Sequence, residues 1–229
     1  MSHSIAHWRC LLALPVLLAL SACGATVYLD KFDAAAPGQA PAPPSTGTSA
    51  ATGSAVIAAH PQNPGSSDRW LRLARPVATQ AGGEYIATFT EQLAHTKASV
   101  SLVGFVPKTS PIMMTVFFEP KAPAPPIPLL HIDLLTNGNI RLNDSTIAGT
   151  FKFDTLIGFV VNFDLTGSAP TASILIRGGG NDVGIDVPVP ANAANFGLGR
   201  VRVVAPFEGV NAPSGAFLVN DLLATRPNQ

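Results

Sequence analysis

Apolar and polar residues alternate in short segments along most of the chain, the pattern of β-strands with one buried face. The clearest case is 159–165, where Phe159, Val161 and Phe163 share one face and Val160 and Asn162 the other. No stretch carries a convincing helical stripe. The same alternation predicts strands at 25–32, 84–91, 100–106, 113–118, 130–134, 140–142, 147–153, 173–177, 185–189, 200–204 and 217–223.

Turn residues such as Asn137-Gly138-Asn139 separate these segments, as in β-hairpins. Many short strands between turns, without helices, are typical of an antiparallel β-sandwich. We therefore expect an all-β fold, a jelly roll, in a single domain that covers residues 53–229. Residues 23–52 hold a first strand and then a segment rich in Pro and Ala. That segment is either a loop on the domain or a flexible tether.

The first 22 residues have a different pattern, with Arg9 in a polar start and an apolar run at 11–20. The run is shorter than the roughly 20 residues of a membrane span and contains Pro15, so it is typical of a secretory signal peptide. Leu20-Ser21-Ala22-Cys23 resembles the lipobox of bacterial lipoproteins. The resemblance implies cleavage between Ala22 and Cys23, and acyl chains, palmitate among them, on Cys23.

Two or three acyl chains make such an anchor effectively permanent. The expected location is the bacterial cell envelope. Residue 24 is Gly, whereas Asp there is the usual inner-membrane retention signal of the lipoprotein family in enteric bacteria, so the resemblance favours the outer membrane, on its periplasmic or surface face. Cys10 leaves with the signal peptide, and no cysteine other than Cys23 remains. Disulfides, thiol catalysis and zinc–cysteine sites are thereby excluded.

The segment order resembles concanavalin-A-like or laminin-G-like jelly rolls over residues 26–225. An opening strand ends in Phe32-Asp33 before a Pro37-Gly38 loop, and 158–165 and 172–179 form a buried strand pair. Residues 215–225 are similar to the closing strand that pairs near the first. The resemblance concerns architecture, since a fold alone does not carry a function.

Charge then limits the function classes. Fourteen Lys and Arg balance fourteen Asp and Glu, which excludes nucleic-acid binding through excess positive charge. The remaining hypothesis is a non-catalytic module for an envelope glycan or a protein partner, or a structural role. The alternative is a carbohydrate-active enzyme, either a glycoside hydrolase or a lyase.

The enzyme alternative depends on one segment, 130–136, whose sequence is LHIDLLT. Jelly-roll glucanases carry Glu, Asp and Glu at near-alternating positions of one strand. Here Asp133 is present, while the flanking acids would fall at His131 and Thr136. His131 and Asp133 share a strand face and can in principle exchange a proton with a substrate, or bind a glycan.

Other candidates are weaker. Trp70 follows a loop and is either the aromatic candidate for stacking on a sugar or a core residue, since tryptophan is highly buried on average. Arg72, Arg141, Arg177 and Arg202 at strand positions are candidates for anionic sugars or for solvation. No cofactor is expected apart from a structural calcium ion, because jelly-roll modules often clamp their first and last strands with one. Its candidate ligands are Asp30, Asp33 and Asp221.

Overall fold

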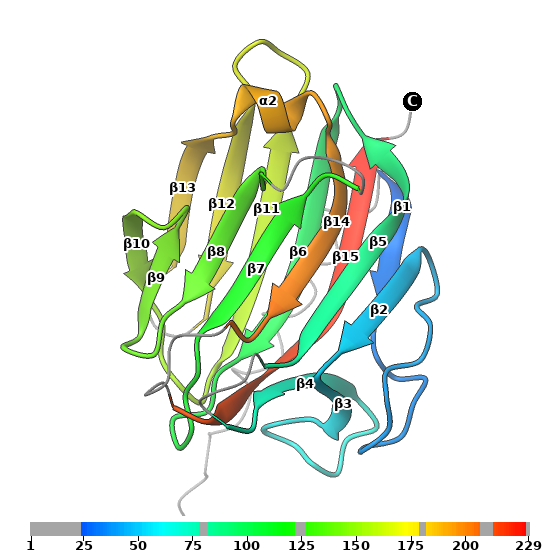
Figure 1. Cartoon of the computed structure of the whole chain (residues 1–229), viewed down its shortest axis with the longest axis vertical. Helices are drawn as coiled ribbons and strands as arrows, with labels where there is room; N and C mark the ends of the chain where they lie inside the picture. Colours follow the sequence, from blue (N-terminus) through cyan, green and yellow to red (C-terminus); the bar gives the residue numbers. More distant parts are fainter. Residues whose placement is uncertain (1–23, 78–81, 122–126, 179–181, 207–212, 228–229) are drawn as a thin grey trace, which may run out of the picture.

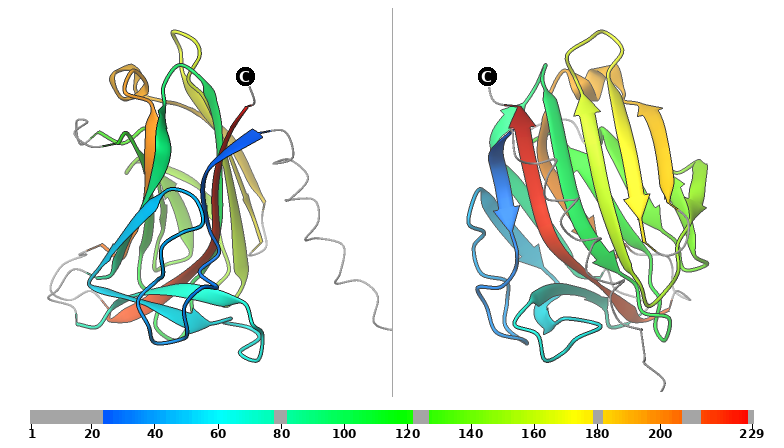
Figure 2. Two further views of the ribbon diagram at one scale, coloured as in Figure 1. Left: turned by 90° about the vertical axis from the view of Figure 1, so that its right-hand side faces the viewer. Right: turned by 180° about the vertical axis from the view of Figure 1, so that it is seen from behind.

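The computed structural model describes residues 24–77, 82–121, 127–178, 182–206 and 213–227. In these ranges the chain forms fifteen strands and one short helix, α2 (Ala191–Ala194). The strands lie in two antiparallel sheets that pack face to face (Figures 1 and 2), so the predicted all-β sandwich is confirmed. In the part of the chain described, no helix is long and apolar enough to cross a membrane.

One layer is an eight-stranded sheet. Its strands are β1 (Gly24–Asp30), β3 (Ser54–Ala59), β4 (Arg69–Arg75), β6 (Lys97–Phe105), β11 (Leu156–Asp164), β12 (Thr171–Arg177), β13 (Val183–Pro188) and β15 (Gly215–Pro227). They follow the order β13-β12-β11-β6-β15-β4-β3, and β1 pairs with the second half of β15. The first and last strands are therefore neighbours, as the resemblance to jelly rolls implies.

The other layer is a seven-stranded sheet in the order β10-β9-β8-β7-β14-β5-β2. Its strands are β2 (Thr48–Thr52), β5 (Glu84–Leu93), β7 (Met114–Glu119), β8 (Leu130–Leu134), β9 (Asn139–Leu142), β10 (Thr146–Thr150) and β14 (Leu198–Val204). Strands from distant parts of the sequence meet here, because β14 lies between β5 and β7. This order decides which side chains share the outer face of the sheet.

The core lies between the sheets because alternate residues of each strand point inward. In β11, Ile157, Phe159 and Val161 are buried, and the residues between them are more exposed, as the alternation predicts. The ring centroids of Phe118 on β7 and Phe163 on β11 are 5.5 Å apart, so these side chains join the two layers. Burial of each such side chain stabilises the fold by about 1.5–3 kcal/mol.

The segment after β1 lies against the sandwich. Ser45 donates a backbone hydrogen bond to the Leu29 carbonyl (3.0 Å), and Gly38 donates one to the Ile57 carbonyl (2.8 Å). Residues 48–52 then form β2, which pairs with β5. The structure holds this Pro- and Ala-rich segment on the domain at several points along its length, rather than as an extended tether.

Candidate functional site

A group of charged and aromatic side chains covers the outer face of the seven-stranded sheet. Strand alternation produces it, since Val116 and Phe118 of β7 enter the core and Phe117 between them points outward. We call this group the charged face, and it consists of Glu84, Thr115, Phe117, Glu119, His131, Asp133, Arg141, Arg200 and Arg202.

One row of this face crosses three strands. Arg202 of β14 lies opposite Phe117 of β7, and Phe117 lies opposite His131 of β8. The Arg202 guanidinium carbon is 4.1 Å from the centre of the Phe117 ring, a cation–π distance. On the other side of Phe117, the His131 ring is tilted relative to the Phe117 ring, and the two ring centroids are 5.4 Å apart. Phe117 is partly exposed, so the part of its ring that Arg202 and His131 leave uncovered faces outward between two nitrogen-bearing groups.

Two acids on β7 and β5 hold the arginines of β14. Glu119 accepts hydrogen bonds from Arg200 Nε (2.6 Å) and from Arg202 Nη2 (2.9 Å). Arg202 Nη1 also donates to Glu84 (3.2 Å). Burial lowers the pKa of Arg202, but the hydrogen bonds and charges of Glu119 and Glu84 outweigh burial and raise it. The Arg202 guanidinium is therefore fixed as a cation beside the Phe117 ring.

Asp133 occupies the next row of the face and is buried. Its Oδ1 accepts a hydrogen bond from Thr115 Oγ1 (2.6 Å), and its Oδ2 accepts from Arg141 Nε (2.9 Å) and Arg141 Nη2 (2.8 Å). Three donors therefore satisfy the carboxylate in place of water. The predicted pairing of His131 and Asp133 on one face is present, with 3.9 Å between His131 Nε2 and Asp133 Oδ2.

His131 also lies near Asp144, a residue of the β9–β10 turn. His131 Nε2 is 3.2 Å from Asp144 Oδ1. His131, Asp133 and Asp144 each offer one ligand atom within 4.8 Å of the others, as a metal site would require. However, Arg141 Nη2 lies 2.8 Å from Asp133 Oδ2 and 3.7 Å from Asp144 Oδ1. The guanidinium already supplies the positive charge in this cluster, and we assign no metal to it.

Asp133 and Glu119 do not form the acid pair of a glycoside hydrolase, and Asp133 and Asp144, whose oxygens come within 4.8 Å of each other, both contact the Arg141 guanidinium. Such pairs are roughly 5–9.5 Å apart. Asp133 lies opposite Thr115, four residues along β7 from Glu119, which is about 13 Å at the rise of a strand. Asp133 and Glu119 are both held by arginines. The face is thus a set of fixed hydrogen-bonding groups around an aromatic ring.

Of the two roles that the sequence leaves open for Trp70, the structure has the buried one. Its side chain is 2% exposed and packs with Phe105 and Leu218 on the outer side of the eight-stranded sheet. The indole nitrogen donates to Asp68 Oδ2 (3.1 Å). Trp70 therefore cannot act as an exposed stacking platform, because protein atoms cover its ring.

The three predicted calcium ligands do not converge. Asp30 is buried in the core, where it accepts hydrogen bonds from the Tyr85 hydroxyl and from the backbone of Phe32 (2.8 Å). Asp33 accepts a hydrogen bond from the backbone of Arg69 (2.9 Å). The pKa of Asp221 is raised, mainly by burial and further by the nearby charges of Asp68 and Asp33. Calcium needs six to eight oxygen ligands. Among the described residues, the carboxylate oxygens of these three aspartates do not lie close enough together to share one metal ion. We therefore assign no calcium site to them.

The remaining predicted site residues, Ala22 and Cys23, lie outside the described residues. Sequence reasoning missed Phe117, Glu119 and Arg200. Phe117 precedes Phe118 in the sequence MTVFFE, and two adjacent rings hide the alternation that places one of them outward. Arg200 shares an outward face with Arg202, which the strand prediction for 200–204 contained.

The structure, but not the sequence, is similar to known proteins. No protein-family model matches the sequence, and no curated protein does. The endo-1,3-beta-glucanase from Streptomyces sioyaensis has a similar structure, with a TM-score of 0.57, 13% identity and coverage of 91% of this chain and 98% of that one. Lectin II from Ulex europaeus gives a TM-score of 0.54 at 12% identity, over 89% of this chain and 100% of the lectin.

A galactose complex of the lectin UEA-II is similar as well, with a TM-score of 0.53 and 11% identity over 90% of this chain and 100% of that one. At such low identity these likenesses establish the fold alone. The protein has the concanavalin-like jelly-roll fold that lectins and glucanases share.

Proposed function

We propose that this protein is a lipoprotein of the bacterial cell envelope, anchored through Cys23 in the outer membrane, and that its jelly-roll domain binds glycan chains on the charged face without cleaving them. The anchor is supported by the Leu20-Ser21-Ala22-Cys23 motif behind a short apolar run. The glycan ligand is supported by the charged face, and by the fold, since a lectin of this fold is known in complex with galactose.

The row Arg202–Phe117–His131 is the single observation that carries the glycan proposal. The C–H face of a sugar ring packs against an aromatic ring, and its hydroxyls need donors and acceptors around that ring. Phe117 offers the exposed part of its ring, Arg202 over that ring and His131 beside it offer nitrogen donors, and Glu119 offers acceptor oxygens. These groups are fixed by ion pairs before a ligand arrives, which lowers the entropy cost of binding.

The hydrogen bonding of two acids of the face, Asp133 and Glu119, supports binding without cleavage. A general acid must hold a proton near neutral pH and reach the glycosidic oxygen. Asp133 is instead an acceptor for Thr115 and Arg141, and Glu119 is an acceptor for Arg200 and Arg202. His131 and Thr136 stand where jelly-roll glucanases carry glutamates.

The test is a glycan array probed with the full-length lipidated protein in detergent micelles, followed by a titration with the best ligand. Replacement of Phe117 by Ala should weaken binding at least tenfold, because the stacking surface is lost. The control is Ile147→Ala, which removes an exposed apolar side chain from β10 of the same sheet and should leave the affinity unchanged.

Two results would overturn the proposal. Absence of binding to every neutral and anionic oligosaccharide on the array would exclude the glycan ligand. Release of reducing ends from the bound glycan, abolished by Asp133→Asn, would show that the face is catalytic.

A further inference from the structure

The position of Gly24 determines the end of the domain at which an anchor on Cys23 would be attached. Gly24 begins β1 and pairs with Pro227 at the end of β15. Cys23 precedes it directly, and consecutive Cα atoms are about 3.8 Å apart. If Cys23 carries the acyl chains of the proposed function, no spacer separates the bilayer surface from the first hydrogen-bonded strand. The domain must then touch the membrane at the end of the sandwich where β1 starts.

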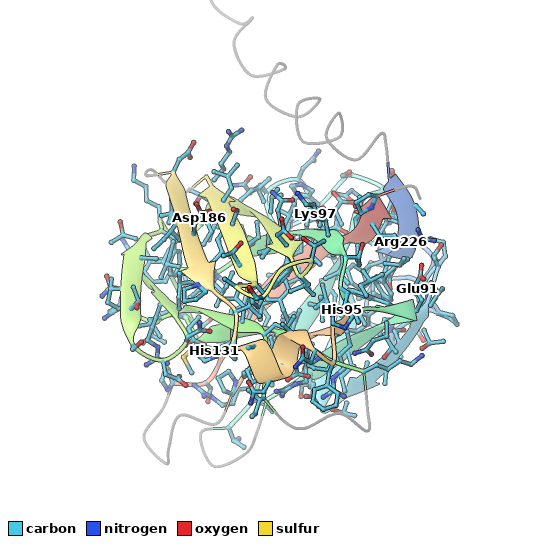
Figure 3. The ribbon with its side chains drawn as sticks, turned by 90° about the horizontal axis from the view of Figure 1, so that it is seen from above. Glu91, His95, Lys97, His131, Asp186 and Arg226 are labelled. Carbon is cyan, nitrogen blue, oxygen red and sulfur yellow. The ribbon has the colours of Figure 1, made fainter. Side chains whose placement is uncertain are left out.

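Several segments form this end of the sandwich, which we call the anchored end. The start of β1, the end of β15 and helix α2 all lie there (Figures 1 and 2). Figure 3 looks onto it and shows Glu91, His95, Lys97 and Arg226 around the β5–β6 turn. Arg226 Nε is 2.6 Å from Glu91 Oε1, so the end of β15 is joined to β5.

Two of the exposed large apolar residues also lie at this end. Phe196 follows α2 and is 47% exposed, and its carbonyl accepts a hydrogen bond from Gln92, next to Glu91. Ile127 is 40% exposed and lies two residues before Leu129, whose backbone pairs with Phe118 near the end of β7. The Lys121 backbone donates to the same Gln92 side chain (2.9 Å), which places the described residues just after β7 at this end.

The charges at the anchored end are compatible with a lipid surface. Lys97 Nζ is 3.1 Å from Asp164 Oδ2, and Arg226 pairs with Glu91, so both acids are matched by bases. Hydrogen bonds from Thr166, aided by Lys97, lower the pKa of Asp164 to about 2. Lys97, Asp164, Gly24 and Arg226 line one shallow groove, about 530 Å³, on the outer side of the eight-stranded sheet. At this groove a headgroup layer would therefore meet carboxylates that are paired with bases.

We propose that the anchored end rests on the bilayer to which Cys23 is attached, with the side chains of Phe196 and Ile127 in the headgroup region. This orientation rests on the lipid anchor of the proposed function. The occupant of this surface is the lipid layer itself. Apolar side chains at an interface add modest affinity, and the short connection to Cys23 supplies the proximity.

The test is a site-specific labelling experiment. Cys23 is the single cysteine of the mature chain and is blocked once acylated, so a newly introduced cysteine is the one thiol that a label can reach. A new cysteine is placed at Phe196, Ile127 or Val77 and labelled with an environment-sensitive fluorophore. Val77 is the matched control, because it is 44% exposed but follows β4 at the opposite end. The labelled lipidated proteins are reconstituted into vesicles of phosphatidylcholine with a minor fraction of phosphatidylglycerol.

Labels at Phe196 and Ile127 should show blue-shifted emission and quenching by lipids brominated near the headgroup, and the label at Val77 should behave as in water. Equal quenching at all three positions, or quenching at neither Phe196 nor Ile127, would overturn the orientation. The mass of the peptide that contains Cys23, measured on the same sample, separates the two proposals. An unmodified Cys23 would overturn the anchor and the orientation together, whereas an acylated Cys23 with labels in water would overturn the orientation alone.

Discussion

Asp30 is a carboxyl group inside an otherwise apolar core. The Tyr85 hydroxyl donates to it, and the Tyr28 hydroxyl is 2.6 Å from that of Tyr85. Burial raises the pKa of Asp30, and the hydrogen bonds from Tyr85 and from the Phe32 backbone only partly oppose the rise. Burial also raises the pKa of both tyrosines, so their hydroxyls keep their protons. This network ties β1 of one sheet to β5 of the other.

The raised pKa predicts a pH dependence of stability. The folded protein keeps the Asp30 proton at pH values where the unfolded chain, with a pKa of about 3.9, has lost it. The contribution of Asp30 is therefore complete below that pH and is lost as pH rises through the folded pKa. In Asp30→Asn this contribution is absent. We expect the free energy of unfolding of the native protein, relative to Asp30→Asn, to fall as pH rises above 4.

Urea denaturation of both proteins across this pH range measures the difference. Parallel stability curves would show that Asp30 titrates alike in the folded and unfolded states. Asp182→Asn is a suitable control, since the Asp182 side chain is exposed to solvent just before β13 and takes no part in this network.

Strand β2 depends on one glycine at its start. Gly47 has φ of +88°, a conformation that L-residues rarely adopt. A Cβ there would lie 2.6 Å from Tyr28 Cδ2 and 2.7 Å from the Thr88 carbonyl oxygen, between β1 and β5. Gly38 has a similar φ of +86° but no atom within 4 Å of its Cβ position. A comparison of alanine substitutions at these two positions therefore separates the effect of backbone strain from that of steric overlap.

Gly47→Ala should destabilise the fold by about 2–4 kcal/mol, because strain and overlap with Tyr28 and Thr88 add. Gly38→Ala should cost only about 1–2 kcal/mol, the strain alone. Thermal or urea unfolding of the two variants compares them directly. Equal losses would mean that β2 shifts freely and that its contact with Tyr28 contributes little to stability.

The strands that the sequence predicts are those with one clearly apolar face. In β11 and β8 the alternation of large apolar residues identified the strand and the side that faces the core, although His131 and Asp133 on the other side of β8 are buried as well. Strand β2, with the sequence TSAAT, has no such face and is a strand because β5 offers it a partner. Helix α2 spans four residues, too few for a periodic pattern.

The candidate site was predictable only within one strand. His131 and Asp133 share a face by alternation, which the sequence shows. Their neighbours Arg141, Phe117 and Arg202 come from three other strands, and the order of strands in a sheet does not follow from local pattern. The exposure of Trp70 could not be predicted for a related reason, since Trp70 lies in β4 and is covered by Phe105 of β6 and Leu218 of β15, two strands that are distant in the sequence.

On the scale of the whole molecule, the strands run between the anchored end and the opposite end (Figure 1). With the anchored end on the bilayer, both sheets stand upright, and the charged face becomes a side wall. Phe117 lies two residues before the end of β7 on the side of the anchored end, which is about 7 Å of strand. A glycan chain that runs along the membrane surface can reach this wall without moving the domain.

This arrangement predicts the effect of a linker between Cys23 and Gly24. A Gly/Ser linker of about 20 residues has a root-mean-square length of about 25 Å, so it releases the anchored end from the bilayer. A fluorophore at Phe196→Cys should then lose its blue shift, because the label and Ile127 give only weak binding without the short anchor. Affinity for a soluble oligosaccharide should stay unchanged, since the charged face keeps its ion pairs. Titration of the linker protein in vesicles measures the emission of the label and the affinity for the oligosaccharide.

A blue shift that persists would show that the anchored end binds lipid by itself. A loss of oligosaccharide affinity would show that the membrane forms part of the glycan site.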